Sequence, residues 1–271
     1  MGHYRTVGAI PPKRHTQFRN DSAGAREGTL RYEELMGEEG FSSDSSLLYH
    51  LGVPSAIVDS RVWELPDLAT TPNHPLVPRH LRLHDLAKPD ESSASDPVTG
   101  RRLVLGNGDV RISYVRAAAT SPLYRNAVGD ECVFVEAGSG VVETVFGVVP
   151  FRPGDYVLVP RATTHRWVPD GPVQAYVIEA NGHIAPPRRY LSRYGQFLEH
   201  APYCERDLHA PSEPHLAEGD DVEVLVKHRG NGPSGLVGSR MTYATHPFDV
   251  VGWDGCLYPY TFNVSDFEPI T

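Results

Sequence analysis

The chain has 271 residues, of which 40% are hydrophobic and 22% charged, a composition typical of a globular protein that buries a sizeable core. Its formal net charge is -9, and the sequence contains no long run of basic residues. We therefore do not expect nucleic acid as a partner. The sequence has neither an apolar run of membrane-spanning length nor a signal-peptide core, so we expect no membrane partner. The three cysteines lack a Cys-x-x-Cys spacing, which favours reduced thiols in a cytoplasmic protein.

The first hundred residues (1–100) predict an irregular region with edge strands. Arg31–Met36 has the pattern of a strand or a single helical turn. The stretch Gly37–Ser46 is rich in Gly, Ser and Glu and predicts a polar loop. Alternating apolar residues predict short strands at Leu47–His50 and Ala56–Trp63.

Residues 101–180 show the strand rhythm most clearly. Short runs of β-branched and aromatic residues are separated by Gly and Pro turns, a pattern typical of antiparallel strands. The expected strands are Leu103–Leu105, Val110–Ala117, Cys132–Glu136, Val141–Phe146, Tyr156–Val159 and Gln174–Glu179. This segment is therefore expected to form a compact β core.

The last third of the chain, residues 181–271, is expected to add further strands. These are predicted at Asp221–His228, Met241–Asp249 and Cys256–Val264. The sequence then stops after Phe267-Glu268-Pro269-Ile270-Thr271 without a polar tail. We therefore expect the natural polypeptide to continue beyond Thr271.

One segment resembles a known fold signature. Gly154–Pro160, followed by His165, is similar to the second sequence motif of a cupin. The resemblance implies a mainly β fold, a cupin-like (RmlC-like jelly-roll) β-barrel with a long irregular N-terminal segment and extra strands. In a metal-binding cupin, the residue that matches His165 is a metal ligand at the mouth of the barrel.

The first cupin motif lacks its histidines in this chain. On the cupin pattern the carboxylate position falls at Glu131, or at the adjacent Asp130, and the His-x-His pair falls at Tyr124 and Asn126. A mononuclear non-haem iron site needs about three protein ligands. His165 and Glu131 are weak, vestigial candidates and are too few, so we expect a structural barrel that binds no metal.

Three longer blocks point to a particular family. They are Lys13–Arg19, Tyr32–His50, and Pro160–Trp167 taken together with His246–Gly255. These blocks resemble bacterial homogentisate 1,2-dioxygenase, and the resemblance covers essentially the whole chain. It implies the reaction of homogentisate with O2 to give 4-maleylacetoacetate, in tyrosine and phenylalanine catabolism.

The resemblance also implies where the chemistry takes place. The family uses one Fe(II), held by two His and one Glu of a C-terminal domain, and it assembles into trimers and hexamers. That domain would begin beyond Phe267, so the iron ligands and catalytic residues are expected beyond Thr271. Residues 1–271 then correspond to the N-terminal domain, inactive alone, and no iron ligand can be transferred onto it.

Two other functions remain open from the residues alone. The chain could be a finished, non-enzymatic cupin module for binding or assembly. It could also be a small-molecule or metal-dependent cupin that uses Glu131 and His165. The common hydrolase, dinucleotide-binding, P-loop and zincin motifs do not occur in the sequence.

Overall fold

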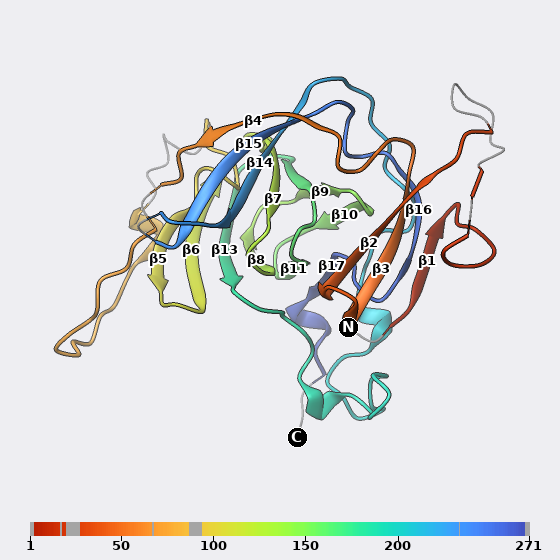
Figure 1. Ribbon diagram of the computed structural model, residues 1–271. Coiled ribbons are helices and arrows are strands. Elements are labelled where there is room, and N and C mark those ends of the chain that lie inside the picture. Colours follow the sequence, from red (N-terminus) through yellow and green to blue (C-terminus); the bar gives the residue numbers. More distant parts are fainter. Residues whose placement is uncertain are drawn as a thin grey trace.

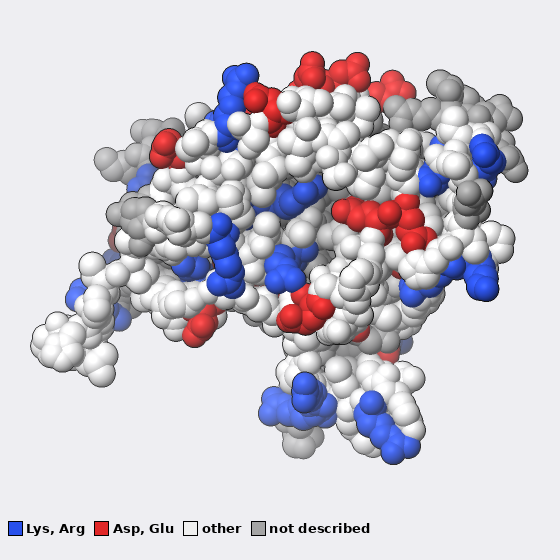
Figure 2. Space-filling view, in the orientation of Figure 1, with Lys and Arg blue, Asp and Glu red and all other residues white. Residues whose placement is uncertain are grey.

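The computed structural model describes residues 3–16, 18–19, 28–66, 68–86, 94–232 and 234–268. These residues form a mainly β molecule with three sheets (Figure 1). Gln17, in the first resemblance block, and 269–271, at the predicted chain end, lie outside the described residues. Within the described ranges, no helix has the length and apolar character needed to cross a bilayer. On the face shown in Figure 2, basic and acidic side chains form separate small groups.

Eight strands form a jelly roll of two facing sheets. One sheet contains β6 (Val110–Ala117), β13 (Val173–Ala180), β8 (Glu131–Ala137) and β11 (Asp155–Val159), in that order. The other contains β7 (Leu123–Asn126), β12 (His165–Pro169), β9 (Gly140–Thr144) and β10 (Gly147–Phe151). This interleaved strand order is that of a jelly roll and confirms the predicted cupin-like fold, although the sheets do not join into one continuous barrel.

Alternation along these strands explains why the two sheets pack together. In β13, Val173, Ala175 and Val177 are buried while the intervening residues are partly exposed. Strands that alternate in this way present one apolar face, which must be covered by the other sheet. The resulting core also contains Trp167 and Val142 of the opposite sheet.

Additional strands widen both sheets. The sheet that contains β7 continues through β14 (Val222–Arg229), which runs parallel to β7, into β15 (Leu236–Tyr243) and the edge strand β4 (Ile57–Trp63). The other sheet gains β5 (Arg102–Gly106) and β17 (Tyr260–Asn263) at its two edges. The added strands β4 and β14 bring Trp63 and Lys227 beside Tyr124 of the jelly roll.

A third sheet packs beside the jelly roll. Its order is β1 (Arg5–Gly8), β16 (Val250–Gly255), β3 (Ser42–His50) and β2 (Tyr32–Glu39) (Figure 1). The fully buried Trp253 of β16 joins this sheet to the jelly roll, because its indole N–H donates to the carbonyl of Phe146 at 2.7 Å. The described residues also contain the 3-10 turns η1 (Leu83–Leu86), η3 (Arg188–Tyr190), η4 (Glu205–Asp207) and η5 (Val264–Asp266).

The N-terminal region is more regular than the sequence predicts. The prediction of a polar loop at Gly37–Ser46 is wrong, because β2 and β3 form a hairpin in which Glu39 pairs with Ser42. Gly40 occupies the turn with a φ of 61°, which glycine adopts without steric cost. The prediction of irregular or edge structure is also wrong for β3, which is paired on both sides. Tertiary pairing here overrides the weak strand preference of Ser, Gly and Glu.

Two late strands have other bounds than the sequence predicts. The strand expected at Met241–Asp249 is β15, which begins earlier and ends at Tyr243, and the one expected at Cys256–Val264 is β17, which begins only at Tyr260. The buried strand β16 lies between the two predictions and was missed. Pro259 immediately precedes β17 and lacks the backbone N–H that a sheet ladder requires.

Candidate functional site

The four cupin-pattern positions meet inside the jelly roll. Glu131 is fully buried, and its Oε1 accepts hydrogen bonds from the Tyr124 hydroxyl at 3.1 Å and the Asn126 amide at 2.9 Å. The rings of Tyr124 and His165 meet edge to face, with their centroids 5.5 Å apart. The structure therefore brings these four side chains together.

The alternative carboxylate, Asp130, is used elsewhere. Its two oxygens accept hydrogen bonds from the backbone N–H groups of Arg161 and Ile184, both at 2.8 Å. Asp130 thus fixes two loops rather than contributing to the centre of the jelly roll.

Two cations and one further carboxylate occupy the space beside Glu131. The Arg101 guanidinium donates to Glu131 Oε2 at 2.9 Å and to Glu179 Oε1 at 3.1 Å. Lys227 donates to the same oxygen of Glu179. Arg101, Glu131, Glu179 and Lys227, called here the buried charge network, each expose less than a tenth of their side chains. Their formal charges cancel, which is the condition for keeping ions in a low-dielectric interior.

The protonation states follow from these contacts. Burial alone would raise the pKa of Glu131, but the charges of Arg101 and Lys227 hold it well below its usual range. Burial raises the pKa of the Tyr124 phenol well above 10, so the phenol remains a hydrogen-bond donor. Burial also lowers the pKa of His165, which favours the neutral imidazole.

The tautomer of His165 leaves one nitrogen without a partner. Its Nδ1 lies 3.0 Å from the carbonyl oxygen of Thr163, and since a carbonyl only accepts, Nδ1 carries the proton. The Nε2 lone pair is buried and has no hydrogen-bond partner among the described residues. His165 is therefore the one cupin-position side chain that keeps a ligand atom free.

These side chains do not fit a mononuclear Fe(II). Both oxygens of Glu131 already accept hydrogen bonds, and the Arg101 guanidinium beside them would repel a divalent cation. No group of three or more His, Cys, Asp or Glu side chains arranged for a metal occurs in the part of the chain that the structure describes. Without further ligands, the free nitrogen of His165 is insufficient for a site of this kind.

Sequence reasoning missed three members of the network: Arg101, Glu179 and Lys227. Strand alternation carried the signal for two of them. Glu179 continues the inward row of β13 after Val177, and Lys227 follows the buried core residue Leu225 by two positions in β14. Arg101 lies before β5 and carried no comparable signal.

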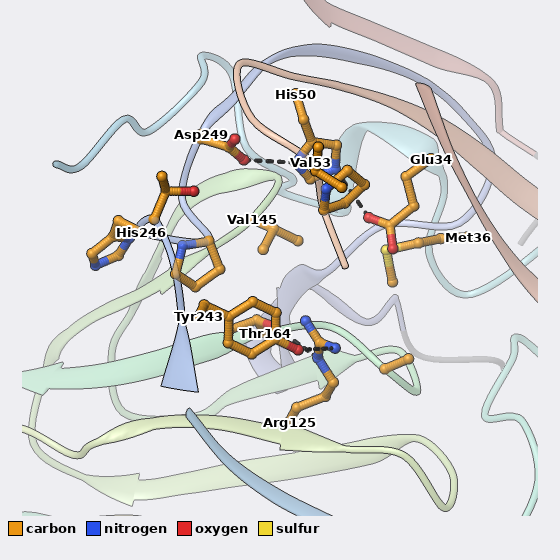
Figure 3. Close-up of a pocket in the computed structure, with 14 residues that line it drawn as sticks. Glu34, Met36, His50, Val53, Arg125, Val145, Thr164, Tyr243, His246 and Asp249 are labelled. Atoms are coloured by element: carbon orange, nitrogen blue, oxygen red, sulfur yellow. Dashed lines mark hydrogen bonds and ion pairs between the residues drawn. The ribbon is translucent and has the colours of Figure 1, made fainter. Parts of the chain in front are cut away.

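A second polar cluster lies between the third sheet and the jelly roll (Figure 3). The buried His50 bridges two carboxylates, with its Nδ1 2.6 Å from Asp249 and its Nε2 3.0 Å from Glu34. Arg125 lies on the opposite side of the cavity, where it donates to Thr164 and Tyr243. The cavity volume is about 20 Å³, enough for one water molecule.

Glu34, His50 and Asp249, called here the His50 clamp, hold neighbouring segments together and leave no ring nitrogen of His50 free to react. Burial alone would lower the pKa of His50, but hydrogen bonds with Asp249 and Glu34 raise it to about 9. His50 is consequently a cation at neutral pH, and both of its ring nitrogens are occupied. The clamp joins β2 and β3 to the segment that precedes β16.

The geometry defines a class of protein: a cupin-like jelly roll whose centre contains an ion-pair network in place of a set of metal ligands. The family profile described as homogentisate 1,2-dioxygenase N-terminal matches residues 53–264. The chain belongs to this family.

Several relatives give the extent of the match. A protein of Saccharolobus solfataricus that carries a dioxygenase name is 34% identical over all of this chain and 66% of its own length. Homogentisate 1,2-dioxygenase of Emericella nidulans is 28% identical over 66% of this chain and 40% of its own length. Homogentisate 1,2-dioxygenase of Nitrobacter hamburgensis is 28% identical over 54% of this chain and 31% of its own length. The chain thus spans less than two thirds of the length of these relatives.

Among solved structures, a cupin superfamily protein from Desulfitobacterium hafniense aligns with 44% of this chain and 97% of its own. The sequence identity of that alignment is 19% and the TM-score 0.31.

The His50 clamp predicts a stability that depends on pH. In the folded protein the pKa of His50 is about 9, above the ordinary value of 6.5. The charged imidazole therefore stabilises the folded state fully below about pH 6.5, and this stabilisation is lost as the pH rises through 9. Replacing His50→Gln is expected to cost up to about 3 kcal/mol of unfolding free energy near pH 6 and much less near pH 10. Denaturant unfolding at both pH values measures the difference, with the exposed His84→Gln as control. A loss of equal size at both pH values would contradict the clamp.

The buried charge network predicts a large cost for removing one ion. Arg101→Met leaves Glu131 buried without its counter-charge and is expected to lower the unfolding free energy by about 3–5 kcal/mol. Adding Glu131→Gln to that variant removes the stranded charge and is expected to restore part of the loss. The control is Arg61→Met, which breaks an exposed pair with Asp59 and should cost about 1 kcal/mol or less. Equal costs for the two arginine variants would refute a stabilising network.

Proposed function

We propose that this chain is the metal-free scaffold half of an Fe(II)-dependent ring-cleaving dioxygenase. The proposed reaction is that of homogentisate with O2 to give 4-maleylacetoacetate, in tyrosine and phenylalanine catabolism. Membership of the N-terminal family and the two relatives named homogentisate 1,2-dioxygenase support the reaction. The observation that carries the scaffold role is the Arg101–Glu131 ion pair at the position of a cupin metal.

The iron in this proposal is held by residues outside the chain. The chain's own contribution is a rigid, charge-balanced jelly roll, whose centre is closed by Tyr124, Arg101 and Glu131. Such a domain can cover an adjoining active site and restrict its exposure to water, without supplying a catalytic residue.

The proposal includes assembly into trimers or hexamers and a cytoplasmic location. Apolar side chains on the edge strand β4 support assembly, since Val58 and Val62 expose 59% and 75% of their surface. Leu76 is 88% exposed on the extended segment that follows. The three cysteines are free, as a reducing compartment requires.

Oxygen uptake with homogentisate and Fe(II) tests the proposal. The 271-residue chain, shown to be folded by circular dichroism, is expected to consume no oxygen above the Fe(II) background. The full product of the gene that encodes the chain is expected to consume oxygen in step with homogentisate.

Two results would contradict the proposal. Absence of uptake by the full gene product would refute the dioxygenase reaction and favour a non-enzymatic cupin module. Uptake by the 271-residue chain that disappears in His165→Ala would place catalysis within this jelly roll.

A further inference from the structure

Strand β4 forms one edge of the seven-stranded sheet and pairs with β15 on one side (Figure 1). Six of its seven residues are exposed. Within the described ranges, no other strand pairs with the outer edge of β4. An edge of this kind presents unpaired backbone N–H and C=O groups and can accept a further strand.

Two other edge strands are protected against such pairing. β10, at the opposite edge of the same sheet, contains Pro150, which cannot donate to a ladder. β2, at the edge of the third sheet, contains four glutamates, so two paired copies would bring like charges together. β4 contains no proline, and its ionic residues are one acid, Asp59, and one base, Arg61.

The sequence of β4 is complementary to itself about Ser60. In an antiparallel pair of two copies centred on Ser60, Asp59 of each copy lies opposite Arg61 of the other. Val58 comes opposite Val62 in the same register. A two-fold axis through the centre makes the two ionic contacts equivalent, so one strand supplies both halves of an isologous interface.

The position across from Arg61 in its own sheet holds a like charge. The residue directly opposite on β15 is Arg240, which pairs with Glu223 of β14. Arg61 contacts Asp59 of its own strand, in a pair that is largely exposed. Opposite charges across a strand pair stabilise it, and like charges destabilise it. A carboxylate on the open side of Arg61 would therefore offset the like charge of Arg240.

We propose that two copies of this chain associate through antiparallel pairing of their β4 strands, centred on Ser60. The seven-stranded sheets of the two copies then form one continuous sheet, and the contacts between Asp59 and Arg61 fix its register. The irregular step in the pairing of β4 with β15 lies at Val58, outside the central Asp59–Arg61 segment. Because the contact is short, association is expected in the micromolar range.

This contact rests on the assembly included in the proposed function and specifies part of it, because two trimers that form a hexamer require a two-fold contact. Its test needs neither iron nor homogentisate, so failure of the oxygen-uptake assay leaves the contact unaffected. Copies that assemble regardless of charge changes in β4 would refute this contact and leave the assembly itself intact.

Analytical ultracentrifugation of the 271-residue chain and two charge-reversed variants tests the pairing. Asp59→Arg and Arg61→Asp each place like charges at both equivalent contacts and are expected to weaken self-association at least about tenfold. An equal mixture of the two variants is expected to restore association, because one copy then presents two carboxylates and the other two guanidinium groups. Arg188→Asp, at an exposed arginine of η3, is the control and is expected to leave association unchanged.

Three results of this experiment would overturn the proposal. The first is absence of self-association of the wild-type chain at about 100 µM. The second is undiminished association of both charge-reversed variants, shown to be folded by circular dichroism. The third is a mixture that associates no better than either variant alone.

A pair of cysteine variants locates the two-fold axis independently. Ser60→Cys places two thiols opposite each other and is expected to give a disulfide-linked dimer on oxidation with copper phenanthroline, above the background of the wild-type chain. Ser55→Cys, at an exposed serine before β4, comes opposite Leu65 of the other copy and is expected not to cross-link. Equal cross-linking of the two variants, or none in Ser60→Cys, would overturn the proposed register.

Discussion

The ion pair between Glu131 and Arg101 occupies the centre of the jelly roll, and the other buried polar contacts there depend on it. A carboxylate with no solvent exposure must be neutralised, and the guanidinium 2.9 Å away does so at the position where a cupin would hold a metal. Through Glu179 the same guanidinium is linked to Lys227. One arginine therefore contacts both carboxylates of the buried charge network.

The two polar clusters stabilise different parts of the molecule. The buried charge network lies inside the jelly roll and neutralises its interior, while the clamp formed by Glu34, His50 and Asp249 holds the third sheet against it. The network pairs two cations with two carboxylates, whereas the clamp pairs the single cation His50 with two carboxylates. Neither cluster presents three His, Cys, Asp or Glu side chains arranged for a metal in the described residues.

Much of the fold could be predicted from local pattern alone. Alternation and Gly or Pro turns identified five of the eight jelly-roll strands, namely β6, β8, β9, β11 and β13, but not β7, β10 and β12. The residues at the cupin-pattern positions, Glu131, His165, Tyr124 and Asn126, lie together in the structure. The hairpin around Gly40 could not be predicted, because its polar strand gains its stability from pairing with distant β16. Arg101 was missed for the same physical reason, since its partners Glu131 and Glu179 lie 30 and 78 positions away in the sequence.

Anaerobic equilibrium dialysis against Fe(II), followed by metal analysis, tests most directly whether an ion pair has replaced the metal in this jelly roll. The wild-type chain is predicted to retain substoichiometric iron, and His165→Ala is predicted to retain the same amount, because Arg101 already neutralises Glu131. One equivalent of iron in the wild type that is lost in His165→Ala would show a working metal site and contradict the account.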